Sequence, residues 1–162
     1  MTGRLKAPAV LKVLMVCTGN ICRSPTAEGV LQRLAEQAGL AHRVQVDSAG
    51  LSAYHVGEAP DRRSQSHALK RGYDLSKRRA RQVCAADFEE FDVLLAMDRG
   101  HLDELKRQCP PDRQARIRLL MDYASPDMGR EVPDPYYGGA AGFEDVLDRV
   151  EVACQGFLER EF

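Results

Sequence analysis

The order of hydrophobic segments in this 162-residue chain predicts an α/β domain with a parallel β-sheet covered by helices on both faces. Three observations lead to this fold class. The segment VLKVLMV (10–16) is apolar and β-branched, which is typical of a strand buried on both faces. After this strand, apolar residues between 27 and 38 follow helical spacing. Strand-like and helical segments continue to alternate, which favours parallel strands joined by right-handed crossovers.

Each later element has its own local signal. Apolar residues between 27 and 38 recur at helical spacing, and Gly39 suits the C-terminal cap of that helix. The segment RVQVDSAG (43–50) alternates like a second strand, and a short helix starting near residue 62 is expected to end near Gly72. The remaining expected elements are two buried strands and the helix between them, at 91–97, 115–121 and 99–108.

The C-terminal part combines a long loop with a final helix. Residues 125–142 are rich in proline and glycine, which indicates a loop. The apolar stripe that follows has helical spacing and includes Cys154, so we expect this cysteine in the core. No linker divides the chain, and we therefore expect one domain over 10–162 after a short, poorly ordered extension at 1–9.

Composition excludes several classes of protein. The net charge of −1 gives no reason to expect nucleic-acid binding, and the basic run at 77–81 is typical of a solvated face. No apolar run has the length of a membrane span or of a signal-peptide core. The five cysteines fit no disulfide framework and no zinc-site spacing. We expect a cytoplasmic protein without metal or cofactor, whose four histidines are structural.

Residues 17–24, CTGNICRS, lie between the first strand and the first helix, and they predict an anion-binding loop. Ligands of parallel α/β sheets bind outside the carboxyl ends of the strands, and Cys17 stands at that point. Gly19 and Asn20 tolerate left-handed backbone. Such a turn directs successive N–H groups toward one anion.

Two features favour the thiolate form of Cys17, which is the nucleophilic form of cysteine. Ser24 suits the N-cap and Pro25 the first helical position, so the positive end of the helix would face the sulfur. Arg23 adds a charge that persists at neutral pH and can bind two oxygens of one anion. The loop is therefore suited to hold phosphate while the sulfur attacks phosphorus, which gives a phosphocysteine.

The motif C-x5-R-S near the N-terminus and DPYY late in the chain resemble the low-molecular-weight protein tyrosine phosphatase family, bacterial type. Further matching stretches are DSAG (47–50), ARQ (80–82), FDVLLAMD (91–98) and VPDPYYGG (132–139). The resemblance implies a four-stranded parallel sheet in a Rossmann-like or flavodoxin-like fold. It also implies metal-independent hydrolysis of phosphotyrosine in proteins and of small aryl phosphates. The implied partner is a phosphotyrosine-containing protein, such as a tyrosine kinase, and the expected state is a monomer.

The resemblance also assigns catalytic roles, with Cys17 as nucleophile, Arg23 as phosphate clamp and Asp134 as the acid–base residue. Chemistry supports the last assignment, because a phenolate leaves more easily when it is protonated. Two flanking prolines stiffen the loop around Asp134. Asp127 in the same loop is the weaker candidate for this role.

The phosphate-binding loop and its support form the next group of expected site residues. The loop residues expected to bind phosphate are Thr18, Gly19, Asn20, Ile21, Cys22, Arg23 and Ser24. Ser24 is expected to donate to the Cys17 sulfur, to cap the helix, or both. Asn20 and Ser48 resemble a pair that supports the loop in the family, where a histidine often stands at the position of Arg78. Cys22 resembles a second loop cysteine that bonds to the nucleophile on oxidation, and the alternative is that it only packs.

The expected substrate pocket is aromatic and is formed by Leu51, Tyr54, Tyr136 and Tyr137. The two tyrosines after Asp134 can form a wall beside a phenyl ring. They are read in the family as phosphorylation targets too, and the alternative is that they are exposed loop residues. Leu51 and Tyr54 lie where the family has a variable substrate-facing loop.

Three other functions compete with this one. Arsenate reductase uses the same scaffold but needs a relay of cysteines, and after Cys84 no cysteine follows until Cys109. Phosphoarginine phosphatase resembles this loop but carries threonine at the position of Ile21, where its hydroxyl orients water. A phosphopeptide-binding module without activity is disfavoured because all three implied catalytic residues are present.

Overall fold

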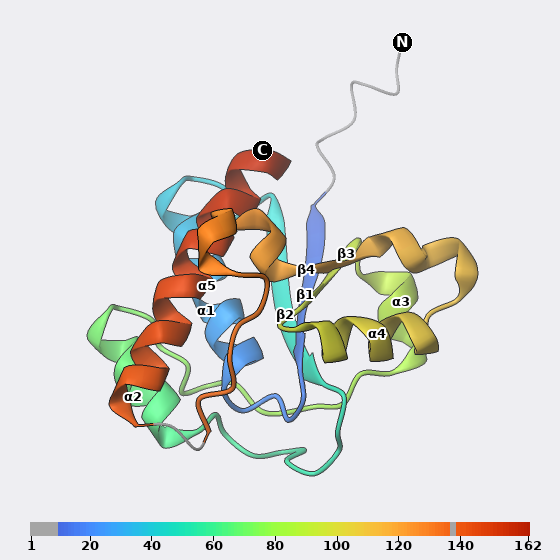
Figure 1. Ribbon diagram of the computed structural model, residues 1–162. Coiled ribbons are helices and arrows are strands. Elements are labelled where there is room, and N and C mark those ends of the chain that lie inside the picture. Colours follow the sequence, from blue (N-terminus) through green and yellow to red (C-terminus); the bar gives the residue numbers. More distant parts are fainter. Residues whose placement is uncertain (1–9, 137–138) are drawn as a thin grey trace.

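The computed structural model describes residues 10–136 and 139–162 and is built around a four-stranded parallel sheet (Figure 1). The strand order β2–β1–β3–β4 places the first strand in the middle, and the predicted fold class is confirmed. The strands are β1 Leu11–Cys17, β2 Val44–Gly50, β3 Val93–Ala96 and β4 Ile117–Leu119. The extension expected at 1–9 and Tyr137 lie outside the described residues.

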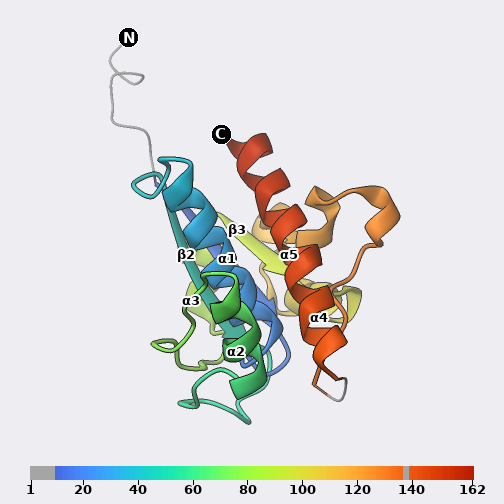
Figure 2. The same ribbon diagram turned by 90° about the vertical axis from the view of Figure 1, so that its left-hand side faces the viewer.

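Helices cover both faces of the sheet, with α1, α2 and α5 on one side and α3 and α4 on the other (Figures 1 and 2). Their bounds are α1 Arg23–Gln37, α2 Arg62–Lys70, α3 Ala85–Glu90, α4 Arg99–Gln108 and α5 Ala140–Glu161. Three short 3-10 helices complete the described part of the chain, at η2 Pro111–Arg116, η3 Leu120–Tyr123 and η4 Pro126–Met128. No helix in the described part is long and apolar enough to cross a bilayer.

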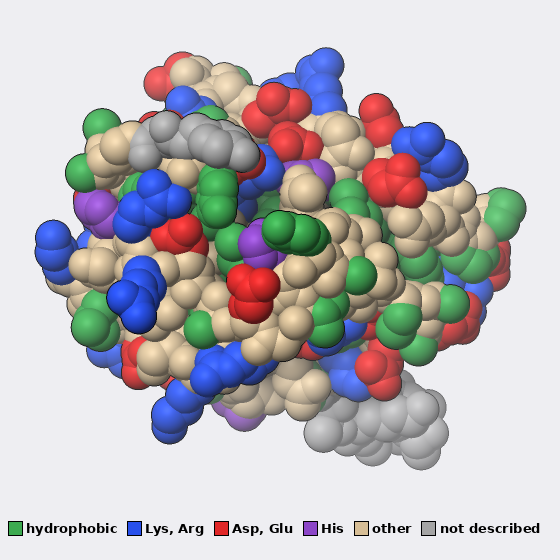
Figure 3. Space-filling model, turned by 90° about the horizontal axis from the view of Figure 1, so that it is seen from below, with side chains coloured by type: hydrophobic (Ala, Val, Ile, Leu, Met, Phe, Trp, Pro, Cys, Tyr) green, Lys and Arg blue, Asp and Glu red, His purple; other side chains and the backbone are tan. Residues whose placement is uncertain are grey.

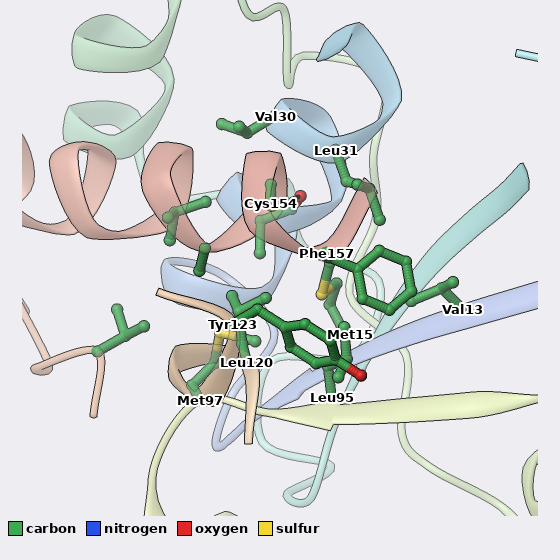
Figure 4. Close-up of a cluster of buried hydrophobic side chains, with 14 of the residues drawn as sticks. Val13, Met15, Val30, Leu31, Leu95, Met97, Leu120, Tyr123, Cys154 and Phe157 are labelled. Atoms are coloured by element: carbon green, nitrogen blue, oxygen red, sulfur yellow. Dashed lines mark hydrogen bonds between the residues drawn. The ribbon is translucent and has the colours of Figure 1, made fainter. Parts of the chain in front are cut away.

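The apolar character of β1 follows from its central place, because its side chains point alternately into two cores. Val13 and Met15 belong to the larger core, which lies under α1 and α5. Leu14 and Val16 belong to the smaller core under α3 and α4. In the larger core the rings of Tyr123 and Phe157 meet edge to face with centroids 5.0 Å apart (Figure 4).

Two strands and the first helix differ in bounds from the expectation, and one further helix was not expected. The strands expected at 91–97 and 115–121 are both shorter, and the second ends at Leu119 because Leu120 and Met121 are buried in the 3-10 turn η3. Burial alone does not distinguish these two backbones. The helix α3 was not predicted, since six residues are too few to show a helical period. The first helix begins at Arg23, with Cys22 and not Ser24 in the N-cap position.

The contact between α5 and η3 depends on one glycine. A Cβ atom at Gly156 would lie 2.0 Å from the carbonyl oxygen of Tyr123, which is main chain and cannot rotate away. We predict that Gly156→Ala lowers the free energy of unfolding by about 2 kcal/mol or more through overpacking. Gly142→Ala is the matched control in the same helix, where the new Cβ would have an ordinary 3.6 Å contact with Pro135.

Chemical denaturation of both variants measures the difference. The control is expected to be neutral, or more stable by up to about 1 kcal/mol, because alanine favours helix more than glycine does. Equal midpoints for Gly156→Ala and the wild type would contradict the close approach of α5 and η3.

Candidate active site

A cavity of about 480 Å³ opens at the carboxyl end of β1, on the face shown in Figure 3. Its floor is the loop after β1, and two other loops form its sides. The lining residues are Cys17, Thr18, Gly19, Ile21, Cys22, Arg23, Ser52, Tyr54, His55, Asp134 and Tyr136. The structure therefore brings the three expected catalytic residues, Cys17, Arg23 and Asp134, to one cavity.

Asn20 has a φ of 59° and is the one non-glycine residue with positive φ in the described part of the chain. Its side chain is buried and makes three hydrogen bonds. The amide nitrogen donates to Ser24 Oγ (2.8 Å) and Ser48 Oγ (2.9 Å), and the amide oxygen accepts from the main-chain N–H of Arg81 (3.0 Å). The expected pairing of Asn20 with Ser48 is present, and it supports the left-handed turn.

Gly19 was expected to tolerate left-handed backbone, but of the two residues only Asn20 adopts it, since the φ of Gly19 is not positive. A side chain at this position would have to displace the ring of His55. A Cβ atom would lie 2.9 Å from Cδ2 of His55, whose ring packs over the loop. His55 was expected to be structural only, yet it lines the cavity.

Ser24 holds its hydroxyl against the Cys17 sulfur and does not cap the helix. Its Oγ lies 3.0 Å from Cys17 Sγ and accepts from the amide of Asn20. Because the amide occupies a lone pair of the oxygen, the hydroxyl proton can point to the sulfur. The contact therefore links the Asn20 amide, the Ser24 hydroxyl and the Cys17 sulfur.

Arg23 is buried, and other residues orient its guanidinium. Nη1 donates to Asp98 Oδ2 (2.9 Å) and to the carbonyl oxygen of Val132 (3.1 Å). Nη2 lies 3.8 Å from Asp134 Oδ2. The Asp134 side chain is about half exposed at 53 %, and its Oδ1 accepts from the N–H of Tyr136 (3.0 Å). Asp127 does not line the cavity and instead bonds to Ser125.

His101 and Asp98 support the loop from the side of β3, and sequence analysis assigned them no such role. Nε2 of the buried His101 lies 2.7 Å from Thr18 Oγ1, and Nδ1 lies 3.2 Å from Asp98 Oδ1. Burial lowers the pKa of His101 to about 4, so the ring is neutral at pH 7. The sequence signal that could have identified these two residues is their position, because Asp98 follows β3, the parallel neighbour of β1.

Arg78 takes part in the supporting network through an acidic residue. Ser48 Oγ donates to Glu28 Oε1 (2.6 Å), and Arg78 Nε lies 3.2 Å from Glu28 Oε2. Burial raises the pKa of Glu28, while the Ser48 hydroxyl and the Arg78 charge act in the opposite direction. The polar chain thus runs from Arg78 through Glu28, Ser48 and Asn20 to Ser24.

The walls of the cavity are partly as expected. Tyr54 and Tyr136 both line it, and Tyr54 is strongly exposed at 83 %. Leu51 does not line it, contrary to expectation, because its side chain packs against the smaller core. Cys22 is buried and lines the cavity, and burial raises the pKa of its thiol to about 12.

Comparison with known proteins gives the class of this protein. Residues 12–161 match the family model of the low molecular weight phosphotyrosine protein phosphatases. A putative low molecular weight protein-tyrosine-phosphatase of Synechocystis is 48% identical over 149 residues, which cover 91% of this chain and 94% of the relative. The chain therefore belongs to the low molecular weight phosphotyrosine protein phosphatase family, whose substrates are phosphoproteins.

Solved structures agree with this assignment. The crystal structure of a protein tyrosine phosphatase from Entamoeba histolytica matches with a TM-score of 0.91 and 38% identity, covering 93% of this chain and 96% of that one. A Drosophila arginine phosphatase matches with a TM-score of 0.87 and 34% identity, covering 93% and 98%. The scaffold is thus shared by phosphatases named for different phosphoamino acids.

The low pKa of His101 predicts a pH dependence of stability. An unfolded histidine has a pKa of about 6.5, so between pH 6.5 and 4 the unfolded state binds more protons than the folded state. Stability from this group is complete above pH 6.5 and is lost as the pH falls. The charged groups that act on the ring are Asp98, Arg23, Asp134 and Glu131.

We predict that the wild type loses about 2 kcal/mol more than His101→Gln when the pH falls from 7 to 4.5. Urea unfolding of both proteins across this range measures the loss. Parallel stability profiles would show that His101 takes up its proton as readily in the folded as in the unfolded state.

Proposed function

We propose that the cavity around Cys17 hydrolyses phosphotyrosine in proteins, and small aryl phosphates, through a phosphocysteine intermediate. The single observation that carries the proposal is the 3.0 Å contact between Ser24 Oγ and Cys17 Sγ in the cavity that Arg23 and Asp134 also line. A cysteine sulfur within hydrogen-bond distance of a hydroxyl, at the end of a central strand and in one cavity with an arginine, is suited to act as a nucleophile.

In the first step the Cys17 thiolate attacks phosphorus, and the S–P bond forms as the bond to the phenolic oxygen breaks. The N–H groups of the loop from Thr18 to Arg23 bind the equatorial oxygens, together with the guanidinium of Arg23. Asp98 supports this role by orienting the Nη1 side of Arg23. Asp134, as the carboxylic acid, gives its proton to the departing oxygen.

In the second step the phosphocysteine is hydrolysed. The Asp134 carboxylate takes a proton from a water molecule, and the water oxygen attacks phosphorus as the S–P bond breaks. Phosphate and the Cys17 thiolate are the products, and Asp134 regains its proton. The hydrogen bond from Ser24 stabilises the thiolate as a leaving group.

The walls of the cavity favour a flat aromatic substrate. Tyr54 and Tyr136 offer aromatic faces for a phenyl ring above the loop, and Ile21 lines the floor with an apolar side chain. A polar phosphoarginine side chain finds no hydroxyl at position 21. This supports phosphotyrosine-containing proteins, including tyrosine kinases, as substrates. We propose further that residues 10–162 act as one catalytic domain, as a monomer in the cytoplasm.

A side-by-side activity measurement tests the reaction and the substrate class. Peptides that carry phosphotyrosine, phosphoserine or phosphoarginine are offered without added metal. We expect turnover of phosphotyrosine at least about 100-fold above the other two, because only it fits both aromatic walls. Cys17→Ser is expected to abolish turnover and still bind vanadate.

Two outcomes would contradict the proposal, one its substrate class and one its mechanism. Preferred turnover of phosphoarginine would assign this chain to the second activity known on the scaffold. Substantial phosphotyrosine turnover by Cys17→Ser would overturn the phosphocysteine mechanism.

Cys22 is the proposed redox partner of the nucleophile. Its raised pKa keeps it protonated, so peroxide oxidises Cys17 first and gives a sulfenic acid. Attack by the Cys22 sulfur then forms a disulfide and releases water. We predict that mild peroxide gives a Cys17–Cys22 disulfide and that reductant restores activity.

Peptide mapping identifies the product. Cys22→Ser is expected to recover several-fold less activity, while the exposed Cys84→Ser serves as control and recovers like the wild type. Sulfinic acid on Cys17 with Cys22 still reduced in the wild type would refute the protective role.

A further inference from the structure

The start of helix α2 is attached to the phosphate-binding loop. Asp61 is the N-cap of α2, and its side chain accepts from the main-chain N–H groups of Arg63 (2.8 Å) and Ser64 (3.4 Å). Its own main-chain N–H donates to the carbonyl oxygen of Ile21 (2.8 Å), in the middle of the phosphate-binding loop. The first turn of α2 therefore has a defined position relative to the floor of the cavity.

Arg63, in this first turn, extends from α2 to the loop that carries Asp134. Its Nη2 donates to the carbonyl oxygen of Tyr136 (2.9 Å), and its Nε and Nη2 donate to Asp61 (3.3 and 3.1 Å). The guanidinium carbon lies 5.5 Å from the ring centroid of Tyr136 and 4.8 Å from that of Phe143. Asp61 thus orients a side chain that holds the far side of the cavity.

Phe143 gives this contact a rigid base. It is buried near the start of α5, and the ring of His67 from α2 stacks on it with an interplanar angle of 5° and centroids 5.5 Å apart. His67 also bonds to Glu144, and Arg71 bonds to the same carboxylate (2.6 Å). The two helices lie side by side at this point (Figures 1 and 2).

The main chain on either side of Asp134 is held at two residues. Before it, the N–H of Val132 donates to the carbonyl oxygen of Met97 (2.8 Å), and its own carbonyl oxygen accepts from Arg23. After it, the carbonyl oxygen of Tyr136 accepts from Arg63, and the N–H of Tyr136 donates to the Asp134 carboxylate. The contact with Arg63 therefore acts on the residue that orients this carboxylate.

We propose that Arg63 is a positioning residue for proton transfer, which holds the Asp134 carboxylate over the phosphate-binding loop through Tyr136. The inference rests on the proposed role of Asp134 as acid. The Arg63 side chain is about half exposed, at 47 %, so its ion pair with Asp61 adds little stability. Arg63 acts instead through geometry, because a displacement of a catalytic group by about 1 Å can cost about 100-fold in rate.

The experiment measures kcat/KM for substituted phenyl phosphates whose leaving phenols span a range of pKa values. This constant reports the steps through release of the phenol, the step that an acid assists. The proteins compared are the wild type, Arg63→Gln, Asp134→Asn and the double variant. Arg62→Gln is the matched control, because it removes the same charge from the neighbouring exposed position of α2.

We expect Arg63→Gln to lose about tenfold on phenyl phosphate and less than about threefold on a nitrophenyl ester, which needs little protonation. Its inhibition by inorganic phosphate and the rate of Cys17 alkylation should match the wild type. The double variant should be no slower than Asp134→Asn, since the two residues act in one step. The slope is the dependence of log kcat/KM on the pKa of the leaving phenol. Arg62→Gln should keep the wild-type slope.

Each other outcome contradicts a particular claim. A wild-type slope in Arg63→Gln beside a steep slope in Asp134→Asn would overturn the inference alone. A flat slope in Asp134→Asn would overturn the acid role of Asp134, and the inference with it. Should thermal unfolding show that Arg63→Gln does not fold, Arg63→Lys replaces it. Lysine keeps the charge and loses the forked contact with Asp61, and an unchanged slope there would also reject the proposal.

Discussion

The buried amide of Asn20 is the interaction on which the rest of the site depends. A non-glycine residue in left-handed backbone costs about 1 kcal/mol, and the three hydrogen bonds of this side chain offset that cost. The same bonds leave the Ser24 hydroxyl directed at the Cys17 sulfur. Because the amide that supports the turn also bonds to Ser24, the loop cannot relax without moving the Ser24 hydroxyl relative to the Cys17 sulfur.

Charges around the cavity are paired, and this pairing makes their burial tolerable. Asp98 orients Arg23, and Arg78 lies against Glu28, which accepts from Ser48. A buried charge without a partner destabilises the fold by several kcal/mol. The two members of each pair are therefore held next to one another. Burial opposes ionisation of Asp98, but the N–H of His101 and the charge of Arg23 outweigh it and lower its pKa. The guanidinium is thereby oriented before any phosphate binds.

The two halves of the site differ in burial, as their proposed tasks require. The residues proposed to hold phosphate are enclosed between β1 and α1, whereas Asp134 lies on an exposed loop. An exposed carboxylic acid can exchange its proton with water, while a buried loop keeps its N–H groups directed at the anion without reorganisation. The contacts of Arg23 with Val132 and of Arg63 with Tyr136 hold the main chain of this loop on either side of Asp134.

The sequence by itself determined the features that depend on neighbours along the chain. The buried strand β1, the loop after Cys17 and the helix that follows are continuous, so composition and spacing predict them. Only the tertiary structure decided which distant residues support that loop. His101 meets Thr18, Arg78 meets Glu28, and Arg63 meets Tyr136 because parallel crossovers and helix packing bring them together. Leu51 turned inward for the same reason, since the smaller core takes an apolar side chain that local sequence cannot direct.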